Sequence, residues 1–465
     1  MKKSMIVYGS CAGVQKKAME YLSQTILDYT CEFPACVGVE DAGQTGEFRC
    51  FYVGTKQNNA YICAHSDAVL THPEEYAILV ENDTVMIEGS DDAGVLYGCV
   101  DFYSKYLMEC EITHNSDRYF VNPFEKPLPD ARIISHPAVS NRGLWTWGHV
   151  IYDYKGYIDN MVRLKMNTVV VWNDFIPINA AEMVEYAHLC NVQVIWGFSW
   201  LWDTNCLESG LADLDRESEN IAALYERDYA GLNGDGIYFQ SFTELHQEYI
   251  GDILIAEAVT NFVNNTASKI LEKHPGLELQ FGLHATSVKE KLEYIAKTDP
   301  RIRIVWEDCG AFPFSYLPED VENFEQTKDF ASRISNLRGK DDCTGMVLKG
   351  LTKLDWGAFE HQKGPFFMGS SSKQMQHNRM DRKKKIWHVV QAGWLVNGGK
   401  VQEMVKLLRD CTGGNLHLTA LVEDGMFEKK LYYPVALLGE ILWDCDTDYE
   451  KLSYQVAARS DVEFA

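Results

Sequence analysis

The chain has 465 residues, with 67 acidic against 43 basic side chains and a formal net charge of −24. One hydrophobic core rarely grows beyond about 250–300 residues, so this length predicts more than one domain. The negative field repels phosphate backbones and anionic lipid surfaces, which argues against nucleic acid and membrane as partners.

The cysteines and the apolar segments indicate the cellular compartment of the protein. Thirteen cysteines are scattered without CxxC pairs, which is typical of a reduced chain rather than of a disulfide scaffold. Segment 1–13 contains only a short apolar run, too short for a signal peptide, and no stretch approaches the ~20 apolar residues of a membrane span. We therefore expect a cytoplasmic, soluble protein, and a homo-oligomer is compatible with the sequence.

Residues 1–125 have the pattern of a small α/β domain. Helical spacing of apolar residues over 14–27 separates two predicted strands, 4–9 and 48–55. Segment 76–90 predicts a hairpin that turns at Glu81-Asn82-Asp83, and an amphipathic helix with an acidic start is predicted over 91–107. The proline-rich segment 122–139 predicts the domain boundary.

From residue 140 the pattern changes to strands that alternate with helices. Seven apolar strands are predicted, at 142–148, 167–174, 192–200, 236–242, 277–285, 301–310 and 345–350. Such repeated units favour an α/β fold with a (β/α)₈ TIM-type barrel over 135–375, followed by a mostly helical region over 376–465. No GxGxxG motif follows an early strand, which argues against a dinucleotide-binding open sheet.

Carboxylates stand where two of these strands end. The active site of a (β/α)₈ barrel lies at the carboxyl ends of its strands, where Glu244 follows the fourth strand and Glu307 and Asp308 the sixth. Glycoside hydrolysis needs one carboxylic acid for the leaving oxygen and a second carboxylate as base or nucleophile. We expect Glu244 to be the general acid and Glu307 or Asp308 the base or nucleophile.

Indoles and polar side chains are the other residues common at the strand ends. Indole faces stack on sugar rings, and polar groups bind hydroxyls. The candidate substrate-binding residues are Trp147, His149, Asn173, Asp174, Trp200, Trp202, His284, Trp306 and Trp356. The structural alternatives are core packing for the indoles and helix capping for Asp174 and Glu244. The histidines show neither HxH nor HExxH spacing, so no metal and no cofactor is expected.

Two stretches resemble a known group of enzymes. Segment 76–107 resembles the small α/β domain that precedes the barrel in glycoside hydrolase families 20, 67, 84 and 89. Segment 141–174, with Arg-Gly followed by the pattern I-D-x-M-x-x-L-K-M-N, resembles the barrel opening of the β-N-acetylhexosaminidases of family 20. This resemblance implies that Arg142 holds the hydroxyls of the terminal sugar.

The end of the fourth strand departs from family 20. That family has Asp-Glu there, and its Asp orients the acetamido group of the substrate, whereas this chain has Thr243-Glu244. A lone Glu at this place resembles the arrangement in the α-glucuronidases of family 67, which invert the anomeric configuration and use a separate base. We expect an exo-acting glycoside hydrolase for a terminal N-acetylhexosamine or uronic acid. The alternatives are a non-catalytic carbohydrate-binding protein on the same barrel, and a barrel enzyme of unrelated chemistry such as a lyase or isomerase.

Overall fold

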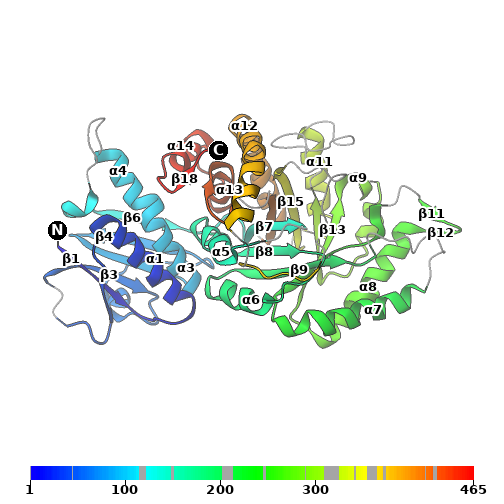
Figure 1. Ribbon diagram of the computed structural model, residues 1–465, viewed down its shortest axis with the longest axis horizontal. Helices are drawn as coiled ribbons and strands as arrows, with labels where there is room; N and C mark the ends of the chain where they lie inside the picture. Colours follow the sequence, from blue (N-terminus) through cyan, green and yellow to red (C-terminus); the bar gives the residue numbers. More distant parts are fainter. Residues whose placement is uncertain are drawn as a thin grey trace. The chain divides into compact units, whose positions relative to one another are not determined.

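The computed structural model describes residues 2–43, 46–114, 122–147, 151–201, 213–244, 248–288, 290–307, 324–339, 342–352, 364–369, 373–413, 415–422 and 427–465. The chain divides into two compact units. The first comprises Met1–Pro137 with the short segments His188–Asn191 and Ala458–Ser460, and the second comprises Ala138–Ala187, Val192–Ala457 and Asp461–Ala465. An open sheet forms the first unit and a closed barrel the second (Figure 1).

The first unit is built on a six-stranded sheet in the order β2-β1-β3-β5-β4-β6. Its pairs are parallel from β2 to β5 and antiparallel from β5 through β4 to β6. The predicted hairpin is confirmed, because Asn82 and Asp83 have φ of 49° and 68°, as a type I′ turn requires. The strands are β1 (Lys3–Tyr8), β2 (Ala35–Gly38), β3 (Phe48–Gly54), β4 (Tyr76–Glu81), β5 (Thr84–Gly89) and β6 (Ala131–Ser135).

Strand β6 moves the end of this unit beyond the predicted residue 125. The prolines of segment 122–139 flank β6 without interrupting it, so β6 can pair with β4 and the unit continues to Pro137. The helical elements of the unit are α1 (Gly13–Thr30), α2 (Ala60–His65), α3 (Asp92–Asp101), the π-helical segment η1 (Phe102–Leu107), α4 (Met108–His114) and the 3₁₀ turn η2 (Pro123–Glu125). Asp91 caps α3 by accepting a hydrogen bond from the Gly94 N–H.

The second unit is a closed eight-stranded parallel barrel, as predicted. Its strands are β7 (Asn141–Trp147), β8 (Thr168–Trp172), β9 (Gln193–Ser199), β10 (Gly236–Gln240), β13 (Glu278–His284), β14 (Ile302–Glu307), β15 (Thr344–Leu351) and β16 (Leu416–Val422). Seven of them correspond to the predicted strands. The eighth, β16, lies within 376–465, so the barrel does not end at residue 375.

The sequence of β16 explains why it was not predicted. The run LHLTALV is a short apolar segment, and periodicity alone does not separate such a strand from a buried helix. It follows the 40-residue helix α12 (Lys373–Thr412) and pairs with β15 and β7, which closes the barrel. Helices α13 (Tyr433–Trp443) and α14 (Tyr449–Ala457) follow it, in line with the predicted helical region.

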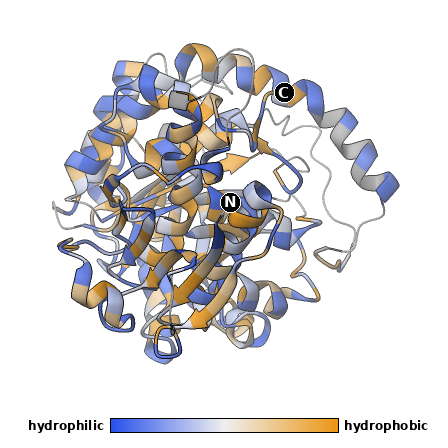
Figure 2. Cartoon of the chain, turned by 90° about the vertical axis from the view of Figure 1, so that its left-hand side faces the viewer, coloured by the Kyte–Doolittle hydropathy of each residue, from blue (hydrophilic) through white to orange (hydrophobic). Residues whose placement is uncertain are grey.

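Helices surround the barrel strands. In Figure 2, which looks onto the first unit, many strand segments are hydrophobic, while the helices carry both hydrophobic and hydrophilic residues. None of the helices in the described ranges combines the length and apolar character needed to cross a membrane. The remaining elements are α5 (Tyr154–Arg163), α6 (Ala180–Leu189), α7 (Leu214–Asp228), η4 (Ala230–Leu232), η5 (Phe242–Glu244), β11 (Tyr249–Ile250), β12 (Ile253–Leu254), α8 (Ile255–Lys273), α9 (Ala285–Val288), α10 (Leu292–Ile295), α11 (Phe324–Ser335), β17 (Leu431–Tyr432) and β18 (Val462–Glu463).

Side chains along each barrel strand alternate between the interior and the surrounding helices. The interior is filled by one cluster of buried residues: Trp145, Val170, Trp172, Ile195, Tyr238, Val305, Val347 and Leu421. This alternation decides which residues at the strand ends face the interior. Glu307 follows Val305 by two positions, and Gln240 follows Tyr238 by two, so both share the interior side.

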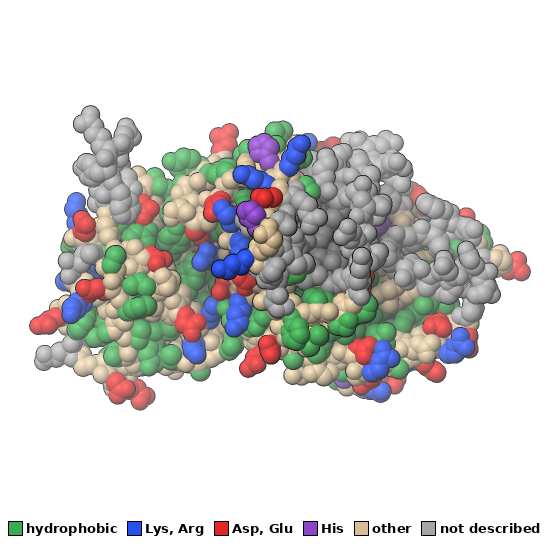
Figure 3. All heavy atoms as spheres, viewed as in Figure 1, with side chains coloured by type: hydrophobic (Ala, Val, Ile, Leu, Met, Phe, Trp, Pro, Cys, Tyr) green, Lys and Arg blue, Asp and Glu red, His purple; other side chains and the backbone are tan. Residues whose placement is uncertain are grey.

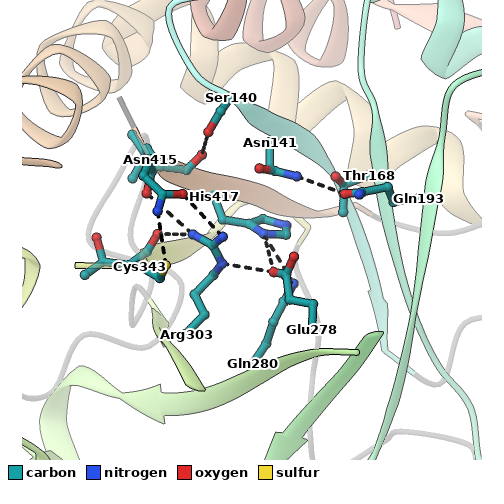
Figure 4. A network of polar contacts seen from close by, with 12 residues as sticks. Ser140, Asn141, Thr168, Gln193, Glu278, Gln280, Arg303, Cys343, Asn415 and His417 are labelled. Atoms are coloured by element: carbon teal, nitrogen blue, oxygen red, sulfur yellow. Dashed lines mark hydrogen bonds and ion pairs between the residues drawn. The ribbon is translucent and has the colours of Figure 1, made fainter. Parts of the chain in front are cut away.

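The amino-terminal end of the barrel is filled by a polar network (Figure 4). Oε1 of Glu278 accepts hydrogen bonds from Nε of Arg303 at 2.9 Å and Nε2 of Gln280 at 2.8 Å, and it lies 3.2 Å from Nδ1 of His417. Burial alone would raise the pKa of Glu278, but the contacts with His417, Arg303 and Gln280 outweigh it and lower the pKa. Burial lowers the pKa of His417, so the network holds a charged Glu278 beside a neutral imidazole.

Candidate active site

Glu307 lies at the opposite, carboxyl-terminal end of the barrel, as the last residue of β14, and is 0% exposed. Its Oε1 accepts a hydrogen bond from the Tyr238 hydroxyl at 2.7 Å and another from the Gln240 amide. Both donors come from β10, which is separated from β14 by β13. These two donors satisfy one oxygen of a carboxyl group that has no contact with solvent.

Gly282 on β13 makes room for the Tyr238 side chain to reach across that strand. A Cβ atom at Gly282 would lie 2.2 Å from the Tyr238 hydroxyl oxygen and 2.5 Å from its Cζ. A glycine inside a strand often marks such a close approach. The same device recurs at Gly197 on β9, where a Cβ would lie 2.7 Å from the Cβ of Trp172.

His284 is the predicted residue that the structure brings next to Glu307. It ends β13 and stands directly opposite Glu307 in the strand register. Its Nε2 lies 2.9 Å from Oε2 of Glu307, which is the distance of an ion pair, although the contact lacks the direction of a hydrogen bond. The His284 side chain is 24% exposed, so it is the more accessible member of the pair.

Four further predicted residues also follow or end barrel strands at this end. Asn173 is partly buried and Asp174 is exposed, directly after β8. Asp174 lies well before α6 begins at Ala180, so it does not cap that helix. Trp147 ends β7, and Glu244 ends η5 directly after β10. The side chains of Trp147 and Glu244 lie outside the described part of the structure.

Two of the predicted indoles pack outside the barrel interior. Trp200 is fully buried and stacks on Phe239, with ring centroids 3.6 Å apart. Trp306 is also buried and packs edge-on against Phe330 of α11, at 5.4 Å. Phe239 and Trp306 alternate with the interior residues of their strands, so they face the helices. Trp200 and Trp306 are therefore packing residues and not the sugar platforms we expected.

Arg142 also differs from its expectation. It is the second residue of β7 and lies fully buried at the amino-terminal end of the barrel, away from Glu307. Its guanidinium donates hydrogen bonds to the backbone carbonyls of Val139, Ser140 and Lys165 at 2.7–2.9 Å. Because these contacts occupy the side chain at the base of the barrel, Arg142 does not join the site.

The predicted residues His149, Trp202, Asp308 and Trp356 lie outside the described residues. Sequence reasoning missed Tyr238 and Gln240, although a signal exists in that Gln240 is a polar residue on an otherwise apolar strand. Across the ranges that the structure describes, no three His, Cys, Asp or Glu side chains are arranged to hold a metal ion.

Comparison with known proteins identifies the architecture. No protein-family model matches the chain, and no curated protein matches its sequence. Among solved structures, it is similar to the GH84 protein CpGH84B, with a TM-score of 0.55 and 11% identity over 98% of this chain and 70% of that chain. The chain has the fold of glycoside hydrolases.

Two further solved structures support this likeness. A GH138 enzyme targeting pectin rhamnogalacturonan II matches with a TM-score of 0.54 and 13% identity over 97% of this chain and 52% of that chain. A family GH115 4-O-methyl-α-glucuronidase with specificity for decorated arabinogalactans matches with a TM-score of 0.54 and 13% identity over 97% of this chain and 58% of that chain. This chain thus spans little more than half the length of these two enzymes. The predicted resemblance to glycoside hydrolases is confirmed for the fold.

Proposed function

We propose that the protein is a glycoside hydrolase that removes a terminal sugar by carboxylate acid–base catalysis. The observation that carries this proposal is Glu307, a fully buried carboxylate at the catalytic end of the barrel with Tyr238, Gln240 and His284 around it. An ionised carboxylate is costly to bury, and such groups cluster at functional sites. A negative charge in this place would stabilise the positive charge that develops on the sugar ring.

We assign each role from the place of the residue along the barrel strands. Glu244, after β10, donates the proton to the leaving oxygen, and Glu307 supplies the negative charge on the base side of the reaction. Asn173 and Asp174 contact the hydroxyls of the terminal sugar, and His284 lies beside Glu307 on the base side. The partner is therefore a carbohydrate, bound without a cofactor.

The substrate we propose is a terminal uronic acid or N-acetylhexosamine. Thr243 precedes Glu244 where family 20 has the Asp that orients the acetamido group, which disfavours catalysis assisted by the substrate. One structural neighbour is a 4-O-methyl-α-glucuronidase, and this likeness of fold supports a uronic acid as the first candidate.

Hydrolysis of a panel of aryl glycosides by the wild type and by Glu244→Gln tests this function. The panel holds α- and β-linked glucuronic acid, N-acetylglucosamine, N-acetylgalactosamine, glucose and galactose. We expect turnover of one member, reduced by about 10²–10⁴-fold in Glu244→Gln, as is typical for loss of a general acid. Glu248→Gln, which changes an exposed carboxylate nearby, should leave the rate unchanged.

Turnover that survives Glu244→Gln would remove Glu244 from the mechanism. No turnover on any member by the wild type, together with binding of one of the same sugars in calorimetry, would contradict a hydrolase and favour the carbohydrate-binding alternative.

A further inference from the structure

The two members of the His284–Glu307 pair differ in how far solvent can reach them. Glu307 is 0% exposed, whereas the His284 side chain is 24% exposed and comes from the neighbouring strand β13. A water molecule or substrate at the carboxyl end of the barrel can therefore reach the imidazole, while the carboxylate is covered.

The contacts of Glu307 also make it poorly suited to react directly with water or with the sugar. One oxygen accepts hydrogen bonds from Tyr238 and Gln240, and the other lies 2.9 Å from Nε2 of His284. Glu307 could approach an anomeric carbon only by breaking the two hydrogen bonds to Oε1 and leaving its place beside the imidazole. This arrangement suits a group that orients its neighbour.

A carboxylate next to one nitrogen of a neutral imidazole favours the tautomer that has its proton on that nitrogen. Here the proton goes to Nε2 of His284, which faces Glu307, so Nδ1 is the nitrogen with the lone pair. A carboxylate beside an imidazole in this way holds the ring in one orientation and stabilises the imidazolium that forms when the ring takes a proton.

We propose that His284 is the general base of the reaction and that Glu307 is its positioning residue, an inference that rests on the proposed function. Nδ1 of His284 takes a proton from water while the water oxygen bonds to the anomeric carbon. The bond from that carbon to the glycosidic oxygen breaks, and this oxygen takes the proton of Glu244. One water is consumed, and the proton on His284 returns to Glu244 through solvent. The product has the inverted configuration at the anomeric carbon.

Kinetics of His284→Gln and Glu307→Gln on the active substrate test these roles. We expect His284→Gln to lower kcat by about 10²–10⁴-fold and to abolish the loss of kcat/KM on the acidic side of the wild-type pH profile. Glu307→Gln should lower kcat less and keep that acidic decline, because the imidazole is still present. A wild-type pH profile in His284→Gln, or a product of retained configuration by NMR, would overturn the assignment.

A matched control exists on the surface of the barrel unit. His274 pairs with Glu226 through Nε2 and Oε1 at 2.8 Å, with side chains that are 30% and 35% exposed. His274→Gln removes the same type of side chain from the same type of pair, but before the first residue of β13, whereas His284 is the last residue of that strand. Its kcat and pH profile should equal those of the wild type.

A second measurement does not depend on activity. The ¹⁵N chemical shifts of histidine-labelled wild-type protein report which ring nitrogen of His284 carries the proton. We expect it on Nε2, and we expect the tautomer population to move toward Nδ1 in Glu307→Gln or Glu307→Asp. A proton on Nδ1 in the wild type would contradict the proposed positioning of His284 by Glu307. If no glycoside is turned over but the proton lies on Nε2, the proposed function fails while the pairing stands.

Discussion

At the scale of single residues, the candidate site depends on an alternation that residue type alone does not reveal. Trp306 and Glu307 are consecutive, so only one of them can face the barrel interior, and it is Glu307. Indoles at the strand ends predicted sugar platforms. Trp306 instead packs against Phe330 of helix α11, and Trp200 stacks on Phe239, which faces away from the barrel interior. The sequence predicted His284 and Glu307 as site residues, and the structure places them side by side. The sequence could not place Arg142, which the second position of β7 puts at the other end of the barrel.

Gly282 shows how a residue without a side chain supports the site. In Gly282→Ala the new methyl group would lie 2.2 Å from the Tyr238 hydroxyl oxygen, so the ring must move away from Glu307. Losing a hydrogen bond to a charged group costs about 1.5–3 kcal/mol, and we expect Gly282→Ala to lower the free energy of unfolding by at least this much. Urea denaturation measures the change.

Two comparisons make this prediction specific. Tyr238→Phe removes only the hydroxyl and should cost about 1.5–3 kcal/mol by itself. Gly276→Ala, just before β13, adds a methyl group with no atom within 4 Å and should leave the stability within about 0.5 kcal/mol of the wild type. Equal stabilities of Gly282→Ala and Gly276→Ala would show that Tyr238 does not depend on the glycine.

At the scale of elements, helix α13 is joined to the base of the barrel by a buried ion pair. Nζ of Lys165, just before β8, lies 2.7 Å from Oε1 of Glu440, and both side chains are buried. Trp443 lies beside the pair, with Lys165 above its ring at 5.3 Å. The apolar pattern of α13 predicts a buried helix. The pairing of Lys165 with Glu440 could not be predicted, because these residues are far apart in the sequence and meet only in the closed barrel. The sequence predicted that barrel without its eighth strand.

Removing one partner of this pair tests how firmly α13 is held. Glu440→Gln leaves the Lys165 charge buried without its counterion, so we expect a loss of about 3–5 kcal/mol in the free energy of unfolding. The exposed pair of Arg333 and Asp329 on α11 provides the control, because Asp329→Asn should cost no more than about 0.5 kcal/mol. Similar losses in both variants, measured by urea denaturation, would contradict a structural role for the buried pair.

At the scale of the whole molecule, the charge of −24 is spread over a mixed surface. On the face in Figure 3, acidic side chains interleave with basic ones. Repulsion among such exposed groups is screened by salt, with a Debye length of about 8 Å at physiological ionic strength. The buried network at the base of the barrel is screened much less, so its contribution to the pH dependence of stability can be separated from that of the surface.

His417 should make the protein less stable in mild acid. Burial lowers its pKa in the folded state, and the nearby Arg303 charge adds to this effect, although Glu278 opposes it. The unfolded chain, with a histidine pKa of about 6.5, therefore binds more protons than the folded one as the pH falls below that value. The contribution of His417 to the free energy of unfolding is complete above about pH 6.5. It is lost as the pH falls toward the pKa of His417 in the folded state, with a slope of at most about 1.4 kcal/mol per pH unit.

Urea denaturation of the wild type and His417→Gln between about pH 5 and pH 8, at low and high salt, measures this slope. The variant should show a shallower loss of stability below about pH 6.5, and the difference should persist in high salt because the group is buried. The lowered pKa of Glu278 adds a second loss only below about pH 4.3, where an unfolded glutamate binds its proton. Identical slopes in the two proteins would mean that His417 gains its proton as readily in the fold as in the unfolded chain.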